Sequence, residues 1–230
     1  MADRPAPESR PIYPLSEAAR YARVAATTLR NWAEGYRVAD HVYPPLLELP
    51  EERQLGQLLL SFENLIEAAL IGAWRRRGIS LQRIRTAHQI ASAEFGAHPF
   101  SRQRVWIGGR DLFALADASD TRGASFTTLT QGGQRALAPA IEQYLETIDW
   151  QSGVASAWRP PEGENVVRLN PRVDFGLPAV RGVRTEILLQ RFLAREHVPE
   201  IAADFGLEPF EVEQALRYEW ALQQPLARAA

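Results

Sequence analysis

The stretch that most restricts how this chain can fold is residues 15–32, LSEAARYARVAATTLRNW. Small apolar residues recur at helical spacing in its first half, and Ser16 can cap a helix there. Leu29 gives the second half an apolar side, and Gly35 is a natural helix end. Two short helices that cross steeply need a small side chain at their contact, and Ala19 supplies it. The stretch therefore predicts a helix-turn-helix.

The outward face of the second helix carries short polar side chains and one arginine: Thr27, Thr28, Arg30 and Asn31. Hydroxyl, amide and guanidinium groups can reach phosphates and base edges, so this face indicates DNA binding. The alternative is an ordinary helical hairpin with a solvated face. Arg23 occupies the turn position where a glycine is expected, and a left-handed conformation there costs about 1 kcal/mol or more.

The segment after this motif can form a small β-hairpin. Residues 36–43 alternate loosely between apolar and polar side chains, and Pro44 and Pro45 break the chain behind them. A hairpin would place Arg37 or Tyr43 near the DNA backbone. A plain connecting loop is an equally good interpretation.

Two further helices follow. Apolar spacing predicts one helix from residue 58 to residue 77 and, after Gly78, a second helix that Ser80 caps. Residues 75–77 are three arginines at the end of the first of these helices, where cations favour the helix dipole. We prefer that interpretation to phosphate binding.

Residues 13–98 resemble the N-terminal domain of MerR-type regulators. The resemblance rests on residues 15–30 and on Arg-x-x-Gly-Ile-Ser-Leu-x-x-Ile-Arg at residues 75–85. It implies a winged helix-turn-helix that binds DNA. The long insertion at residues 38–54 departs from the family pattern. The long coiled coil and the effector domain of MerR proteins are also absent. The resemblance does not imply metal or drug sensing, since the chain has no cysteine and no histidine cluster replaces it.

Composition excludes several classes of site. The chain has no cysteine, so it has no disulfide, no thiolate metal site and no cysteine nucleophile. The four histidines are scattered, and no apolar run is long enough to cross a membrane. Residues 1–12 are rich in proline and charge, which predicts a disordered lead-in without a signal sequence and hence a cytoplasmic protein. The net charge of −2 favours site-specific over indiscriminate DNA binding.

Residues 101–164 predict a small α/β region. Two short strands are expected around Gly108 and Gly109, a helix over residues 135–150 and a further strand over residues 153–158. The three acidic residues that could be tested as a metal site are Asp111, Asp117 and Asp120. They lack ligand spacing, and we interpret them as turn residues.

The last region, residues 165–230, contains a second helix-turn-helix pattern. A strand is expected at residues 165–171 and a helix at residues 185–195, before the pattern that places Gly206 at the turn. The outward face of its last helix is acidic, which phosphates would repel, so we expect protein contact rather than DNA contact. The expected contact residues are Phe210, Glu211, Gln214, Tyr218 and Trp220.

This last region resembles the domain of unknown function 433 found in Vap-type antitoxins. The resemblance rests on Gly-x-Pro-x-Val-x-Gly-x-Arg at residues 176–184, on residues 199–202 and on residues 212–219. Together with the MerR-like front, it implies a Vap-type antitoxin. This resemblance implies a partner toxin with a PIN-like ribonuclease fold and repression of the shared promoter.

These observations predict a mainly α protein with small β elements. We expect a lead-in (1–12), a MerR-like winged helix-turn-helix domain (13–100), a small α/β middle region (101–164) and a helix-turn-helix-like C-terminal module (165–230). The predicted function is a non-enzymatic antitoxin and repressor that binds double-stranded DNA at its own promoter as a homodimer, without cofactor or membrane. The alternative is a regulator controlled by a small effector, without a toxin. Neither converging carboxylates nor a nucleophile with a base is recognisable, so we expect no enzyme activity.

Overall fold

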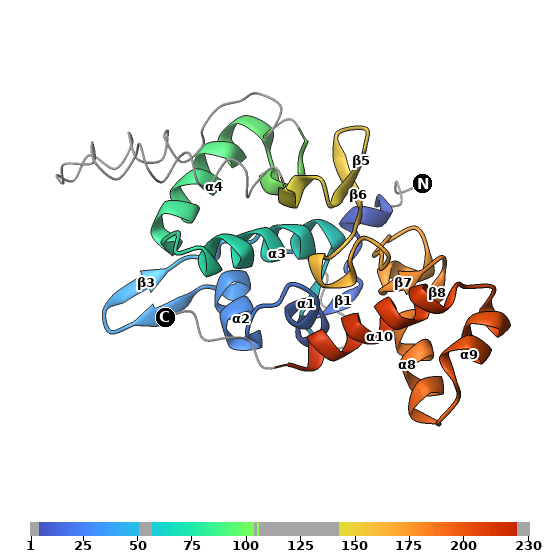
Figure 1. The fold of residues 1–230 in the computed structure, drawn as a ribbon. Coiled ribbons are helices and arrows are strands. Elements are labelled where there is room, and N and C mark those ends of the chain that lie inside the picture. Colours follow the sequence, from blue (N-terminus) through green and yellow to red (C-terminus); the bar gives the residue numbers. More distant parts are fainter. Residues whose placement is uncertain (1–4, 51–56, 104, 106–142, 225–230) are drawn as a thin grey trace.

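The computed structural model describes residues 5–50, 57–103, 105 and 143–224. Helix α3 (Phe62–Arg76) crosses the centre, with α4 (Leu81–Phe95) on one side and α1 (Leu15–Tyr21) and α2 (Ala26–Glu34) on the other (Figure 1). Almost every side chain of α3 up to Trp74 is buried, because helices and strands cover it all round. The protein is therefore a mainly helical body with small antiparallel strand pairs.

The helix-turn-helix forms as its sequence pattern predicts. Ala19, Val24 and Leu29 are all buried, and the Val24 amide donates to the Ala19 carbonyl across the turn. Gly35 ends α2 with a φ of 76°. Ser16 was wrongly expected to cap α1: the helix begins at Leu15, whose amide donates to the Leu58 carbonyl of the neighbouring chain segment.

Two small antiparallel pairs flank this motif. Strand β1 (Tyr13–Pro14) pairs with β4 (Leu59–Leu60), which ties the start of α1 to the start of α3. Strands β2 (Tyr36–Val38) and β3 (His41–Tyr43) form a hairpin. Of the two interpretations of residues 36–43, the structure selects the hairpin, which we call the wing. Its base is held by stacked Tyr36 and Tyr43 rings, whose centroids are 4.6 Å apart.

Side-chain caps fix the starts of α3 and α4. Ser61 and Asn64 form a reciprocal capping box at the start of α3. The Ser80 hydroxyl accepts from the Arg83 amide at the start of α4, as the sequence predicts. Arg75 donates to the Ile79 carbonyl just beyond the end of α3. The short helix η2 (Pro99–Ser101) then packs against α3 and α4.

The expected disorder of residues 1–12 is wrong for the described part of that segment. Residues 7–9 form a short helix, η1 (Pro7–Ser9), in which Glu8 is buried. The Ser9 hydroxyl donates to Glu63 of α3, and Arg172 pairs with Glu8 at 2.8 Å. Composition did not reveal these partners, since they lie far away in the sequence.

The described part of the middle region is a β-hairpin. Strand β5 (Ile148–Gln151) pairs with β6 (Val154–Trp158), so the strand expected at residues 153–158 is confirmed and a helix reaching residue 150 is wrong. Residues 143–145 are helical, as the expected helix requires, whereas pairing with β6 makes residues 148–151 a strand. The strands expected around Gly108 and Gly109, and the three candidate aspartates Asp111, Asp117 and Asp120, lie outside the described residues.

The C-terminal region begins with irregular backbone that joins it to the middle hairpin. Of the strand expected at residues 165–171, only isolated bridges form: Leu169 pairs with Trp158, and Arg168 pairs with Ala179. The short elements are η3 (Pro161–Gly163), η4 (Asp174–Gly176), β7 (Ala179–Val180) and β8 (Val183–Arg184). The middle hairpin and the C-terminal region therefore share one chain of backbone pairings.

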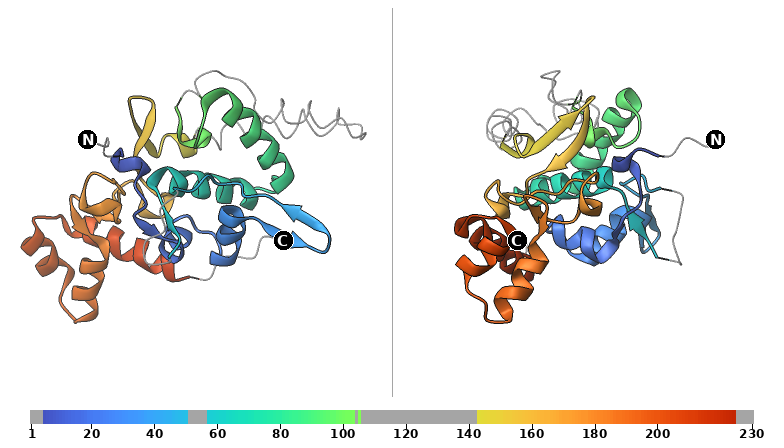
Figure 2. Two further views of the ribbon diagram at one scale, coloured as in Figure 1. Left: turned by 180° about the vertical axis from the view of Figure 1, so that it is seen from behind. Right: turned by 90° about the vertical axis from the view of Figure 1, so that its right-hand side faces the viewer.

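Three helices complete the C-terminal region: α8 (Thr185–Leu193), α9 (Val198–Phe205) and α10 (Pro209–Gln223). Gly206 takes the left-handed turn, with a φ of 64°, as its position predicts. Apolar spacing in residues 185–195 predicts an inward side of Ile187, Leu188, Phe192 and Leu193. Only Leu188 of these is buried, together with Leu189, and the other three are exposed. These helices lie at the opposite end of the molecule from the wing (Figures 1 and 2).

Candidate nucleic-acid interface

The outward face of α2 is open to solvent in the way a DNA-reading helix requires. Thr27, Arg30 and Asn31 are exposed and Thr28 is half-buried, while the opposite side of the helix packs into the core through Leu29 and Trp32. Burial of one side holds the helix in place, so the polar side is free for a duplex. The four residues selected from the sequence therefore share one accessible face.

Arg30 already has a weak partner on its own helix. Its guanidinium lies 3.4 Å from Glu34, one helical turn later, and both side chains are substantially exposed. An exposed pair of this kind contributes about 0.5 kcal/mol or less. Arg30 can therefore leave Glu34 for a phosphate or a guanine at little cost.

The wing places Arg37 beside this helix at the free end of the molecule. Arg37 is exposed, and so are Val38 and Val42 on the same hairpin. The backbone pairs Arg37 with Val42, so the arginine has a fixed position on the hairpin. We call the exposed polar side chains of α2 together with Arg37 of the wing the α2–wing surface, which also includes the exposed carboxylates Glu34 and Asp40.

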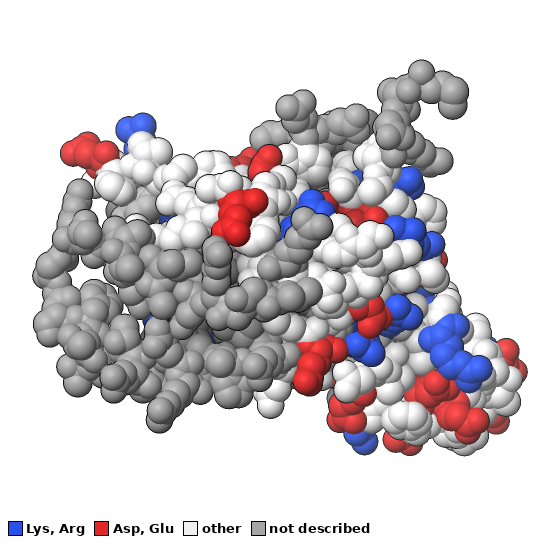
Figure 3. All heavy atoms as spheres, turned by 90° about the horizontal axis from the view of Figure 1, so that it is seen from above, with Lys and Arg blue, Asp and Glu red and all other residues white. Residues whose placement is uncertain are grey.

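Charge on the molecule is mixed rather than segregated. In the view of Figure 3, basic and acidic side chains lie side by side over the described C-terminal helices. Ion pairs account for many of them, among them Arg191 with Asp204 at 2.6 Å and Arg184 with Asp174 at 2.6 Å. Any preference for DNA must therefore come from local groups such as those of the α2–wing surface.

Arg23 occupies the turn position of the helix-turn-helix where a glycine is expected, and the sequence alone does not explain why an arginine stands there. It adopts the left-handed conformation, with a φ of 54°. Its guanidinium donates to the Ala221 carbonyl at the end of α10 and lies 3.9 Å from Glu162. Its own carbonyl accepts from Arg76 at 2.9 Å. The arginine thus caps the C-terminus of α10 and joins the turn to α3, which offsets the backbone strain.

Gly176 belongs to the motif of residues 176–184 and makes a second junction between the two ends of the chain. Its carbonyl accepts from the buried Tyr13 hydroxyl at 2.9 Å. Within the same motif, Val180 is buried and Gly182 has a φ of 87°. In the structure the motif therefore holds the C-terminal region against the helix-turn-helix.

The five residues expected to bind a protein partner do not share one surface. Phe210 and Trp220 are 54% and 64% exposed, whereas Gln214 and Tyr218 are 5% and 0% exposed and lie in the interior. Glu211 is half-buried and lies 3.6 Å from Arg181. The assignment of Gln214 and Tyr218 as contact residues therefore needs correction.

The physical reason is that α10 is covered on more sides than α2. It packs against α8, α9, η3 and β7. The side that remains open follows a helical repeat of three and four residues and is formed by Phe210, Glu213, Arg217 and Trp220. We call this strip the α10 stripe.

The described residues hold no group of three or more side chains arranged to bind a metal ion. None of the helices in the described ranges combines the length and apolar composition needed to cross a bilayer.

Comparison with known proteins relates nearly the whole chain to a mycobacterial group. Residues 11–88 match a family model described as "Putative DNA-binding HTH domain". Over 223 residues the chain is 30% identical to "Putative antitoxin VapB45" of Mycobacterium tuberculosis, which covers 90% of this chain and 92% of that protein. The chain belongs to the VapB45 family.

Two more proteins of Mycobacterium tuberculosis are similar. The uncharacterized protein Rv2308 is 22% identical over 232 residues, covering 91% of this chain and 90% of its own length. The crystal structure of Rv2018 has a TM-score of 0.72 and 26% identity, covering 90% of this chain and 98% of that one. The likeness to VapB45 and Rv2018 thus includes the C-terminal region as well as the helix-turn-helix.

Proposed function

We propose that this protein is a non-enzymatic antitoxin that binds DNA at its own promoter through the α2–wing surface. The carrying observation is the set of accessible side chains on α2, namely Thr27, Thr28, Arg30 and Asn31, with Arg37 of the wing beside them. The match of residues 11–88 to a DNA-binding helix-turn-helix family supports the proposal. We also propose that α2 and the wing together act as a MerR-like winged helix-turn-helix.

Binding as a homodimer is part of this proposal. One short recognition helix contacts too few base pairs for specificity, and two copies on paired half-sites double the information. Measurement of the mass of the protein–DNA complex tests this point.

Replacement of Arg30 by alanine is expected to weaken promoter binding. A guanidinium that contacts a base contributes about 1–3 kcal/mol, which corresponds to roughly a fivefold to 150-fold rise in Kd. Folding should change little, because Arg30 is exposed and its ion pair with Glu34 is a surface pair. Titration of labelled promoter DNA at several salt concentrations measures the effect.

Arg217→Ala is the matched control, since it removes an exposed arginine from the second helix-turn-helix pattern. It should leave DNA affinity almost unchanged. If Arg217→Ala abolishes DNA binding and Arg30→Ala does not, the roles of the two motifs are reversed.

We infer that the toxin, a PIN-like ribonuclease, binds the C-terminal region through the α10 stripe. The similarity to VapB45 supports an antitoxin role, and the exposed Phe210 and Trp220 rings are suited to anchor a partner. Gln214 and Tyr218 are excluded from this surface by their burial.

The double variant Phe210→Ala, Trp220→Ala is expected to lose the toxin while remaining folded. Buried aromatic anchors at interfaces commonly contribute about 2 kcal/mol or more each, so affinity should fall at least about a hundredfold. Co-purification with the protein encoded next to this chain, followed by a ribonuclease assay, measures the loss. Phe175→Ala is the control, because Phe175 is equally exposed but lies on η4. Retention of the toxin by the double variant would exclude the α10 stripe.

The second candidate function is a regulator controlled by a small effector, without a toxin partner. The observation that favours it is a pocket of about 490 Å³ beside the helix-turn-helix. A lone dimer that binds its promoter and recovers no small protein in co-purification would favour this candidate.

A further inference from the structure

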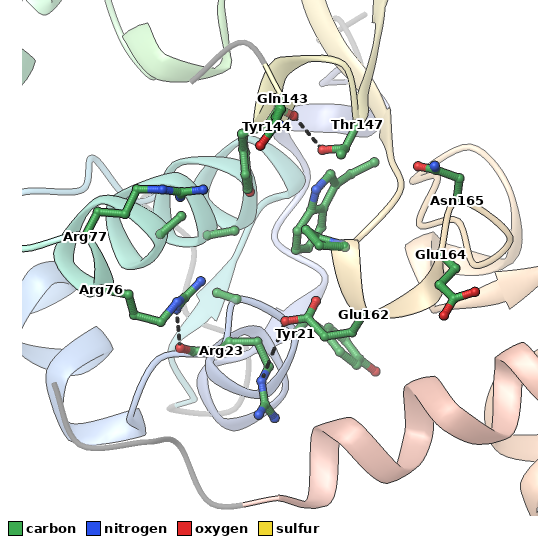
Figure 4. Close-up of a pocket in the computed structure, with 15 residues that line it drawn as sticks. Tyr21, Arg23, Arg76, Arg77, Gln143, Tyr144, Thr147, Glu162, Glu164 and Asn165 are labelled. Carbon is green, nitrogen blue, oxygen red and sulfur yellow. Dashed lines mark hydrogen bonds and ion pairs between the residues drawn. The ribbon is translucent and has the colours of Figure 1, made fainter. Parts of the chain in front are cut away.

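A pocket of about 490 Å³ opens between the helix-turn-helix and the middle hairpin. Figure 4 shows Tyr21 and Arg23 on one wall, Arg76 and Arg77 at the end of α3 on the second, and residues from Gln143 to Asn165, among them Tyr144 and Glu162, on the third. Its volume lies in the range of sites that hold small organic molecules. Three regions that are distant in the sequence therefore build one concavity.

Two buried polar groups of the wall have no hydrogen-bond partner among the described residues. These groups are the Tyr144 hydroxyl and the Trp158 indole N–H, and the two residues are only 7% and 2% exposed. In Figure 4 the Tyr144 side chain extends toward the space framed by Arg76, Arg77 and Glu162. An unpaired buried donor is costly, so both groups are suited to a bound molecule with acceptor atoms.

The charges around the pocket favour an anion. Burial and the neighbouring cations Arg23 and Arg77 lower the pKa of Arg76, although Glu162 and Tyr144 oppose that change. Arg23 is already engaged with α10 and with Glu162. Arg77 is exposed and lines the pocket together with Arg76, whose guanidinium also donates to the Arg23 carbonyl. The two arginines therefore present positive charge to the pocket, beside the carboxylates of Glu162 and Glu164 that also line it.

We propose that this pocket binds a small organic anion, with a carboxylate or phosphate group held by Arg76 and Arg77. The Tyr144 hydroxyl and the Trp158 N–H donate to acceptor atoms of the same molecule. The apolar part of the ligand lies against Ala69 and Ala73, which also line the pocket. This proposal does not depend on a toxin partner or on the α2–wing surface.

The location gives such a ligand direct access to the helix-turn-helix. Arg76 donates to the carbonyl of Arg23, the residue that joins α1 to α2. A ligand that engages Arg76 therefore contacts a residue that already holds the turn.

Three probes test the proposal on the full-length protein: inorganic phosphate, benzoate and adenosine 5′-monophosphate. Isothermal titration is expected to give a Kd in the millimolar range or tighter for at least one of them. Phosphate and benzoate separate the two headgroup chemistries, and the nucleotide adds an aromatic body to a phosphate. Arg77→Gln should weaken that binding by about tenfold, since it removes a charge-assisted contact. Arg195→Gln, an exposed arginine of the α8–α9 connection, should leave it unchanged.

Tyr144→Phe distinguishes a ligand-binding hydroxyl from a structural one. Because the hydroxyl has no hydrogen-bond partner in the part of the chain that the structure describes, its removal should leave the melting temperature unchanged or raise it, while probe affinity falls about tenfold. The proposal is overturned if no probe binds the wild-type protein at millimolar concentration. It is also overturned if Arg77→Gln and Tyr144→Phe both bind the probe as tightly as the wild type, or if Tyr144→Phe lowers the melting temperature without weakening binding.

Discussion

Gly176→Ala is expected to lower the free energy of unfolding by about 3 kcal/mol. A Cβ atom at this position would lie 2.1 Å from the Tyr13 hydroxyl oxygen, and the φ of 74° is unfavourable for any residue with a side chain. Tyr13 cannot move aside, because its ring is buried and its hydroxyl donates to the Gly176 carbonyl. The substitution therefore combines backbone strain, overpacking and loss of a buried hydrogen bond.

Gly182→Ala is the matched control for this prediction. Gly182 has a similar φ of 87°, but nothing lies within 4 Å of the position that a Cβ would take. The control should cost only the backbone strain, about 1 kcal/mol. Urea unfolding of both variants measures the difference. Equal losses would show that Gly176 and Tyr13 are not in close contact in solution.

Glu67→Gln is expected to destabilise the protein by about 3 kcal/mol near pH 6. Glu67 is fully buried in α3, and its carboxylate lies 3.3 Å from His88 and 3.4 Å from His98. Burial alone would raise the pKa of Glu67, but the two imidazoles outweigh it and lower the pKa to about 2. Removal of the carboxylate leaves the imidazoles without their charged partner in the interior.

The pH dependence of this cluster follows from the directions of the two pKa shifts. Burial lowers the pKa of His98, but the contact with the Glu67 carboxylate raises it by more. The net effect is a pKa above the ordinary value of 6.5. The stabilisation from His98 is therefore complete below pH 6.5 and is lost as the pH rises through the raised pKa. The stabilisation from Glu67 is complete above about pH 4.5, the ordinary pKa of a glutamate, and is lost as the pH falls toward its lowered pKa of about 2.

Urea unfolding of the wild type and of Glu67→Gln at about pH 6 and about pH 9 tests this cluster. The difference between the two proteins should be larger at the lower pH, where the imidazole is charged. Glu213→Gln, an exposed carboxylate on α10, should show no such pH dependence. A loss of the same size at both pH values would exclude a charge interaction with the histidines.

Local signals in the sequence predicted the helices well. Helix ends at Gly35 and Gly206, and the cap at Ser80, occur where their residue types require them. The small Ala19 and the buried Leu29 fixed the crossing of α1 and α2, since the steric demands of a steep crossing act between residues close in the chain. The polar face of α2 follows from the same periodicity, which is why the candidate DNA-binding residues all emerge on one accessible side.

Long-range contacts decided the rest. The orientation of α10 reversed the expectation for Gln214 and Tyr218, because packing against α8, α9, η3 and β7 covers sides that helical periodicity alone left open. The pairing of β5 with β6 replaced the last turns of an expected helix for the same reason.

The sequence by itself determined the two helix-turn-helix units and marked Arg23 as unusual, because helix spacing and turn chemistry are local properties. Only the tertiary structure decided that Arg23 caps α10, that Gly176 meets Tyr13, and that Arg76, Tyr144 and Trp158 surround one pocket. Arg23 and Ala221, Gly176 and Tyr13, and Arg76 and Tyr144 are each more than 60 positions apart, and no local pattern encodes which distant surfaces will bury each other.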